Sequence, residues 1–288
     1  MKILFVSLGC DKNLVDSEKM LGMLQEKGYA FTDDEAEADV VVVNTCCFIG
    51  DAKEESINTL LQMGELKDSG QVKALIAAGC LAQRYREEIQ KEIPQVDAII
   101  GTTAIDEIVA ALEEILAGQK QNHYEDINAA PVTETNRVVT TGGHFAYLKI
   151  AEGCDKHCTY CIIPYTRGRV RSRKIEDIEA EAKRLAVGGY KEIVLTGIHL
   201  DSYGVDLENE NLLDVIRRIA AIDGIERIRL VSLEPRIMTE EFVEGLASVK
   251  ELCPHFHLSM QSGCDETLKR MNRKYDTEEF LACCDRLR

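Results

Sequence analysis

Residues 39–46 read DVVVVNTC, and they indicate what kind of sheet this protein contains. Four consecutive valines form an apolar run without polar alternation, which is typical of a strand buried on both faces of a parallel sheet. Similar short apolar runs occur at residues 3–8, 74–78 and 98–100. Segments with helical periodicity separate them, at residues 14–27, 53–66, 84–93 and 105–116. Residues 1–118 are therefore predicted to form a four-stranded parallel, doubly wound α/β domain.

The periodicity disappears at residues 119–143, which are predicted to be a linker. It resumes at residue 144, with strands expected at residues 145–150, 192–195, 227–231 and 255–258. Helices are expected between and after them, at residues 176–187, 212–221, 240–247, 266–271 and 277–287. Four parallel strands do not close a barrel. Residues 144–288 are thus expected to be an incomplete (βα) half-barrel, truncated before the barrel completes, in a fragment of a longer protein.

The composition limits which classes of protein this chain can belong to. With 288 residues, 45% of them hydrophobic, the chain is long enough for two domains with separate cores. A net charge of −16 excludes a general electrostatic attraction to nucleic acid, so any such contact needs a local basic patch. No apolar run approaches the ~20 residues that span a bilayer, and the first residues are too weakly apolar for a secretory signal. We expect a cytoplasmic protein without membrane contact.

Eleven cysteines, an odd number, argue against a disulfide framework in a reducing compartment. Three of them follow the predicted strands of the first domain, namely Cys10, Cys46 and Cys80, which we call the N-terminal triad. The carboxyl ends of parallel strands share one edge of a sheet, where ligands bind. These thiols are therefore predicted to be metal ligands, although each alone could be an ordinary buried cysteine. Cys47 is interpreted as a passenger or a spare ligand.

A second group, the loop triad, consists of Cys154, Cys158 and Cys161 in the segment GCDKHCTYC at residues 153–161. This C-x3-C-x2-C spacing can hold three irons of a 4Fe-4S cluster and leave one iron open. An open iron can chelate S-adenosylmethionine (SAM) and deliver the electron that cleaves it to a radical. The alternatives are a zinc site with His157 as fourth ligand and a short cysteine-rich turn without metal. Zinc sites usually combine two C-x2-C-type elements, and no second such element lies nearby in the sequence.

The loop triad after a strand of a parallel half-barrel resembles the radical SAM superfamily, and the N-terminal triad resembles its methylthiotransferase branch. The resemblance implies an enzyme with two 4Fe-4S clusters and SAM. The loop triad would hold the radical-generating cluster, and the N-terminal triad an auxiliary cluster that carries sulfur. It also implies a reducing electron donor, such as a flavodoxin-like protein, and a sulfur donor as partners. No catalytic residue beyond the cluster ligands is predicted.

The two halves of the chain resemble different members of this branch. Residues 1–163, with SLGCDKNLVDSE at 7–18, resemble enzymes that insert a methylthio group at an unactivated C–H bond of an aspartate in a small-subunit ribosomal protein. Residues 164–288, with LTGIHL at 195–200 and SLEPR at 232–236, resemble tRNA methylthiotransferases that act on threonylcarbamoyl-adenosine next to the anticodon. We expect a ribosomal-protein substrate, with tRNA as the alternative. An iron-sulfur electron carrier or redox sensor is a second alternative, but it would supply four ligands per cluster.

Several other residues carry weaker predictions. The basic segment at 167–174 could contact RNA phosphates or pair with Glu152 and Glu176. Thr196 and Gly197 could approach the methionine part of SAM or form a simple strand-to-loop turn. Glu234 and Gln261 could bind ribose or substrate, but a cap or surface role is expected for each. Tyr160 could stack on adenine or only shield the cluster from water. Packing roles are expected for the four cysteines without ligand spacing, Cys253, Cys264, Cys283 and Cys284.

Overall fold

The computed structural model describes residues 1–131 and 136–288, and these form two compact units. The first unit comprises residues 1–139 together with the short segment 165–167. The second comprises residues 140–164 and 168–288. Within the described residues, no helix is both long enough and apolar enough to cross a membrane.

The first unit is built on a parallel sheet with the strand order β2-β1-β3-β4-β5. Its strands are β1 (Lys2–Ser7), β2 (Ala30–Thr32), β3 (Val40–Thr45), β4 (Ala74–Ala78) and β5 (Ala98–Ile100). The prediction of a parallel α/β domain is confirmed, but the number of strands is wrong: the sheet has five, not four. The missed strand, β2, has three residues and lies at an edge, where none of them is buried. It therefore lacks the apolar run that marks the other strands.

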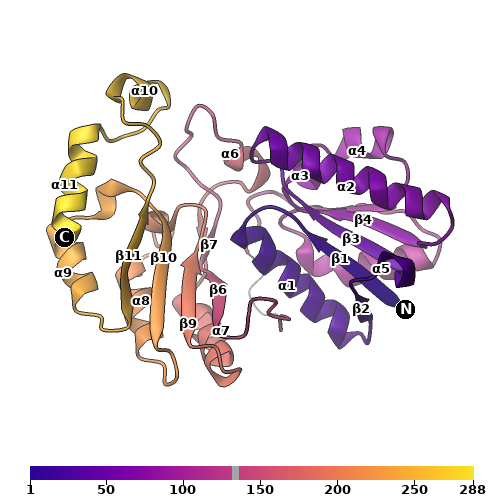
Figure 1. Cartoon of the computed structure of the whole chain (residues 1–288), viewed down its shortest axis with the longest axis horizontal. Coiled ribbons are helices and arrows are strands. Elements are labelled where there is room, and N and C mark those ends of the chain that lie inside the picture. The colour runs from indigo at the N-terminus through magenta and orange to yellow at the C-terminus, as the bar shows by residue number, and fades with distance from the viewer. Residues whose placement is uncertain (132–135) are drawn as a thin grey trace. The chain divides into compact units, whose positions relative to one another are not determined.

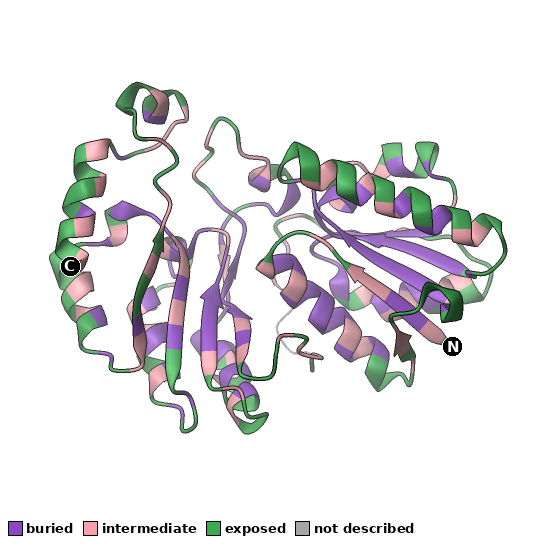
Figure 2. Ribbon diagram, in the orientation of Figure 1, coloured by how far each residue is buried: buried purple, intermediate pink, exposed green. Residues whose placement is uncertain are grey.

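Helices cover both faces of this sheet, as Figure 1 shows. They are α1 (Asp11–Glu26), α2 (Gly50–Asp68), α3 (Gly79–Arg84), α4 (Arg86–Glu92) and α5 (Ile108–Leu116), with 3-10 turns at η1 (Glu35–Glu37) and η2 (Ile105–Glu107). Helices α1 and α5 pack on one face, where Val40 and Val42 meet Met20 and Leu112 in a continuous core. Helix α2 covers the opposite face, so every residue of β3 is buried, as seen in Figure 2.

The second unit contains a four-stranded parallel sheet in the order β11-β10-β9-β6. Its strands are β6 (Phe145–Lys149), β9 (Glu192–Thr196), β10 (Arg227–Leu233) and β11 (Leu252–Leu258). The helices α7 (Ile175–Val187), α8 (Leu212–Ala220), α9 (Glu240–Ala247), α10 (Asp265–Arg270) and α11 (Thr277–Leu287) follow or separate them. An antiparallel pair of short strands, β7 (Ala151–Glu152) and β8 (Arg171–Ser172), encloses the cysteine loop and α6 (Ile163–Thr166). This antiparallel pair was not predicted.

Most of the predicted linker at residues 119–143 belongs to the first unit. The Gly101 N–H donates to the carbonyl of His123, and the Val138 N–H donates to the carbonyl of Glu18. These backbone bonds attach the segment to β5 and α1. Residues 132–135 of the predicted linker lie outside the described residues.

Candidate functional site

The N-terminal triad lies at the carboxyl edge of the first sheet. Cys10 is the residue before α1, Cys46 directly follows β3, and Cys80 is the second residue of α3. Strands β1 and β3 are neighbours in the sheet although β2 separates them in the sequence, so the order of strands reverses between them. Such a switch point is where parallel α/β sheets bind ligands. The structure thus brings the three predicted ligands to one place.

Glycine allows the cysteine loops to approach each other. Gly9 has φ +91°, and a Cβ built on it would lie 2.7 Å from Cys46 Cβ and 2.8 Å from Cys46 Sγ. Gly79 has φ +88°, and its Cβ would lie 2.5 Å from the Thr45 carbonyl oxygen. Both positions combine a left-handed backbone with a contact too close for any side chain. Only glycine therefore fits beside Cys10 and Cys80.

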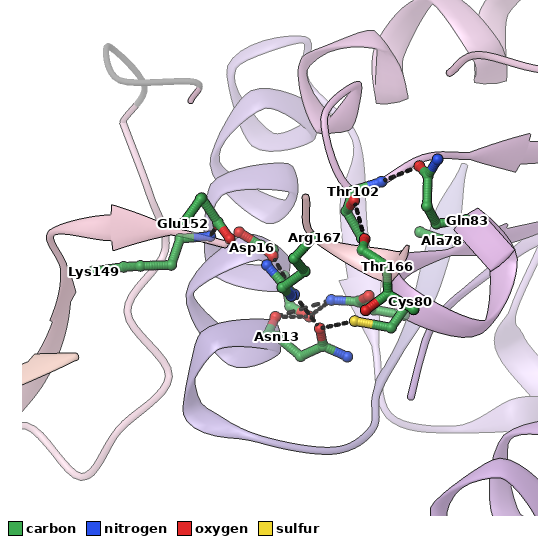
Figure 3. Close-up of polar contacts among 12 residues, drawn as sticks. Asn13, Asp16, Ala78, Cys80, Gln83, Thr102, Lys149, Glu152, Thr166 and Arg167 are labelled. Atoms are coloured by element: carbon green, nitrogen blue, oxygen red, sulfur yellow. Dashed lines mark hydrogen bonds and ion pairs between the residues drawn. The ribbon is translucent and has the colours of Figure 1, made fainter. Parts of the chain in front are cut away.

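Asn13, on the first turn of α1, ties the loops together. Its Nδ2 donates hydrogen bonds of 2.9 Å to the carbonyls of Leu8 and Thr45, which stand two residues before Cys10 and one before Cys46. Its Oδ1 lies 3.8 Å from Cys80 Sγ, as Figure 3 shows. One fully buried amide therefore contacts the neighbourhood of all three cysteines.

Helix α2 supplies a further support. The Ser56 hydroxyl accepts from the Cys46 N–H and donates to the Cys46 carbonyl, both at 2.9 Å. Cys47, the expected passenger, is buried beside the N-terminal triad, and the neighbouring Cys80 and Cys46 affect its pKa. Burial is the main reason that the pKa of the Cys47 thiol is raised to about 12.

The electrostatics of the triad favour metal-coupled deprotonation. Burial raises the pKa of the thiols of Cys46 and Cys80, and the proximity of other triad thiols adds to the effect. The positive charge of Arg167 acts in the opposite direction on both. Burial thus favours the protonated form of the Cys46 and Cys80 thiols, and binding of iron would release their protons. Three free, convergent thiols form a donor set that suits an iron-sulfur cluster.

The loop triad belongs to the second unit and follows β7. Cys154 is buried, whereas Cys158 and Cys161 are partly exposed. Burial raises the pKa of the Cys154 thiol to about 11, and the proximity of Cys161 and Cys158 contributes. The three thiols therefore lie close enough to interact. Their number and softness fit three irons of a cluster, as the spacing predicts.

Backbone contacts hold the cysteine loop in place. Gly153 has φ +71° and its Cα faces the Arg169 carbonyl, so that a side chain there would clash. The Cys154 N–H donates to the Gly168 carbonyl at 3.0 Å. On the other side of the loop, the Asn272 side chain donates to the His157 carbonyl at 3.0 Å. This contact uses the backbone of His157, and its φ of +47° marks a tight turn between two cysteines.

A buried polar group lies at the carboxyl ends of β9 and β10. It consists of His199, Asp201 and Glu234, whose ligand atoms lie within 4.8 Å of one another. Both oxygens of Glu234 already contact cations: Oε2 lies 3.3 Å from Lys156 Nζ, and Oε1 accepts from Arg273 at 2.5 Å. Because these cations compensate the carboxylate charge, the group is better suited to an internal ion-pair network than to a metal ion. Lys156 connects the network to the cysteine loop.

The same network sets the protonation of its members. Burial would raise the pKa of Glu234, but hydrogen bonding and the charge of His199, together with Lys156 and Arg273, lower it to about 2. Burial raises the pKa of Asp201, which accepts the Glu234 N–H. Glu234 is therefore a buried, ionised carboxylate. The cap or surface role expected for it is wrong, because its side chain is buried in the ion-pair network and makes no cap hydrogen bond to the turn that follows.

The structure also places the other residues that the sequence singled out. In the basic segment, Arg167 and Arg173 are buried in ion pairs with Asp16 and Glu181, so these two arginines are not available to RNA phosphates. Tyr160 is 47% exposed and its hydroxyl contacts Gln261 and Arg273.

Among the remaining cysteines, Cys253 and Cys283 are buried as expected. Cys264 is exposed before α10, so the packing prediction is wrong there.

Sequence reasoning missed the residues that support the cysteines. Asn13, Ser56 and Arg167 carry no ligand chemistry of their own, and Arg167 was considered only as part of a basic segment. Asn13 offered one signal, because it lies three residues after Cys10 and directly before the helix that was predicted at 14–27. The position of the other two depends on tertiary contacts with residues far away in the sequence.

Comparisons with known proteins match both halves of the chain. The Uncharacterized protein family UPF0004 matches residues 2–101, and the Radical SAM superfamily matches residues 148–288. The ribosomal protein uS12 methylthiotransferase RimO of Lachnoclostridium phytofermentans is 50% identical over 100% of this chain and 66% of its own length. The RimO of Clostridioides difficile is 45% identical over 98% of this chain and 64% of its own. The chain thus spans slightly less than two thirds of these relatives, and the similarity covers both halves.

A solved structure supports the fold. The radical SAM methyltransferase TsrM from Kitasatospora setae, with cobalamin and a [4Fe-4S] cluster bound, is similar with a TM-score of 0.63 and 15% sequence identity. The similarity covers 99% of this chain and 67% of that one. At this level of identity the likeness concerns the fold alone.

Proposed function

Because this chain belongs to the radical SAM methylthiotransferase family, we propose that the protein it represents inserts a methylthio group into an aspartate of ribosomal protein uS12. The observation that carries the proposal is the convergence of Cys10, Cys46 and Cys80 at one sheet edge, in a chain that also carries the loop triad. A radical SAM enzyme that only generates a radical needs the loop triad alone. The N-terminal triad adds a site that can carry sulfur.

The target aspartate presents an unactivated C–H bond, and no protein acid or base removes such a hydrogen at neutral pH. When bound, SAM and the two clusters would supply the radical, the methyl group and the sulfur that this chemistry needs. The loop triad would hold one cluster with an iron left open, and the N-terminal triad would hold the auxiliary cluster.

The chain's own residues prepare both sites. Asn13 and Ser56 fix the backbone next to the N-terminal triad, which would limit how far the loops must reorder when a cluster binds. Cys46 and Cys80 are at least 93% buried, whereas Cys10 is exposed, so two of the three ligands would be shielded from water. In the second unit, the ion pair between Lys156 and Glu234 anchors the segment between Cys154 and Cys158. These contacts hold the ligands and take no part in bond breaking.

The proposal includes partners and location. A one-electron reductant of the flavodoxin type and a sulfur donor would serve the two clusters. A ribosomal substrate places the protein in the cytoplasm. The tRNA alternative rests on the segments at 195–200 and 232–236, which resemble the tRNA-modifying branch.

Mass spectrometry distinguishes the two substrates. We expect uS12 from cells with the full-length gene to carry a methylthio group on an aspartate, and uS12 from cells without the gene to lack it. Nucleosides from the tRNA of the same two strains serve as the comparison. A difference confined to the tRNA would contradict the proposed substrate and support the alternative.

A further inference from the structure

Arg167 is a charged side chain in the interior of the first unit. Only 1% of its side chain is exposed. Burying a guanidinium is unfavourable unless other groups compensate for the lost water. Asp16, which is also buried, provides one compensating charge: its Oδ2 accepts from Arg167 Nη2 at 2.9 Å. The other contacts of Arg167 indicate its further role.

The guanidinium contacts the residue that organises the N-terminal triad. Arg167 Nη2 donates to Asn13 Oδ1 at 2.5 Å, the same oxygen that lies 3.8 Å from Cys80 Sγ (Figure 3). Arg167 also lowers the pKa of the Cys80 thiol through a hydrogen bond and its charge, against the larger effect of burial. Its charge acts on Cys46 in the same sense. The cation therefore faces two of the three thiols.

The backbone around Arg167 is fixed to the first unit as well. The Thr166 carbonyl accepts a hydrogen bond of 2.8 Å from the Thr102 hydroxyl, and the Thr102 N–H donates to Gln83 at 3.0 Å. Gln83 lies on α3, the helix that carries Cys80. Tyr165 adds a cation–π contact with Arg84 of the same helix, 5.3 Å from its ring centre. Three consecutive residues are thus held next to the triad.

The charges around the N-terminal triad indicate what the buried Arg167 does there. Asp16 is an acidic partner of Arg167. When three thiols bind iron as thiolates, the site gains negative charge, and it gains more when the cluster is reduced. A buried cation next to the ligating sulfurs stabilises the reduced form preferentially and so raises the reduction potential. Lys53 and Arg84 contact the ring of Tyr85, and their charges lower the pKa of the Cys47 thiol against the larger effect of burial.

We propose that Arg167 is the counter-charge of the auxiliary cluster, which positions the ligand loops through Asn13 and raises the reduction potential of that cluster. This inference rests on the proposed function, because it assumes a cluster on the N-terminal triad. Arg167 is a positioning residue here: it acts on the ligands and their charge, and it touches no substrate.

The test uses the full-length protein in which Cys154, Cys158 and Cys161 are all replaced by alanine, so that only the auxiliary cluster can load. Iron content and the midpoint potential, from a redox titration followed by EPR, are measured after anaerobic reconstitution. In this background we compare Arg167→Met, Arg167→Lys and Asp16→Asn. Arg167→Lys keeps the charge and provides a measurable protein if Arg167→Met fails to fold or to retain iron.

We expect Arg167→Met to shift the potential to more negative values and to lose iron faster to a chelator. Arg167→Lys should shift the potential less in the same direction. Asp16→Asn should shift it to more positive values, because it removes a negative charge and leaves Arg167 in place. Potential shifts of opposite sign in Arg167→Met and Asp16→Asn would identify an electrostatic role, since merely structural damage would not depend on the sign of the charge removed.

An unchanged potential in both Arg167 variants would overturn the inference and leave the proposed function intact. Shifts of the same sign in Arg167→Met and Asp16→Asn would also overturn it. If the parent protein itself binds no iron, the auxiliary site fails, and the proposed function and this inference fall together.

Discussion

At the scale of single residues, Asn13 shows why the N-terminal triad needs more than cysteines. Its amide offers two N–H donors and one carbonyl acceptor, and the structure uses both kinds of group. An aspartate would lack the donors, and a leucine would leave two buried carbonyls without partners. The loops before Cys10 and Cys46 are therefore held by a side chain that does not bind metal.

Glu234 gives a residue-scale prediction about pH. Its pKa of about 2 in the folded protein lies below its ordinary value of 4.5, so its ion pairs stabilise the fold fully above pH 4.5. That contribution is lost as the pH falls toward 2. At about 1.4 kcal/mol per pKa unit, it amounts to roughly 3 kcal/mol. We expect Glu234→Gln to lower the free energy of unfolding by about this amount at pH 7, and the difference from the unmodified protein to shrink below pH 4.5.

Urea denaturation at a series of pH values measures this difference. Glu179→Gln is the matched control, because Glu179 also pairs with two cations, Lys183 and Arg218, but both of these are more than half exposed. Exposed pairs contribute about 0–1 kcal/mol. Equal losses in the two variants, or a Glu234→Gln effect that does not depend on pH, would show that the buried network does not stabilise the fold as described.

At the scale of elements, α2 supports Cys46 through one hydroxyl. Ser56 is fully buried and bonds both backbone groups of Cys46. Ser56→Ala leaves that N–H and carbonyl without these partners, and an unsatisfied buried group costs about 1–3 kcal/mol. We expect a loss of unfolding free energy in this range, together with weaker retention of iron by the auxiliary site.

Thr59→Ala is the control for Ser56→Ala. The Thr59 hydroxyl bonds the Glu55 carbonyl on the exposed side of the same helix, so its loss should change stability by less than about 0.5 kcal/mol. Denaturation and chelator kinetics compare the two variants. Similar stability and iron retention in both would mean that α2 does not hold the Cys46 loop.

Elements also show what a sequence pattern can and cannot predict. The buried strands β3 and β4 carry unbroken apolar runs, and the predictions for them agree with the structure within two residues. The helix predicted at 84–93 corresponds to α4, but the short helix α3 at 79–84 was not predicted, and the two are separated at Tyr85, whose backbone leaves the helical region. Six residues are too few for a helical period to stand out in the sequence.

At the scale of the whole molecule, the parts of the candidate site that could be predicted are those marked by a spacing or a position in the sequence. The loop triad is visible as a spacing, and the N-terminal triad as a position after three strands. Arg167 was not predictable, because it lies 151 residues from Asp16 in the sequence and its role depends on where the chain folds back. A basic segment predicts an exposed surface, whereas this structure buries two of its arginines.

The central claim is that each of two cysteine triads holds its own cluster. Iron and sulfide content after anaerobic reconstitution tests it most directly, in the full-length protein and in two variants that each have one triad replaced by alanine. We predict about eight irons per chain in the unmodified protein and about four in each variant. About four irons in the unmodified protein, with no loss when Cys10, Cys46 and Cys80 are replaced, would contradict the account.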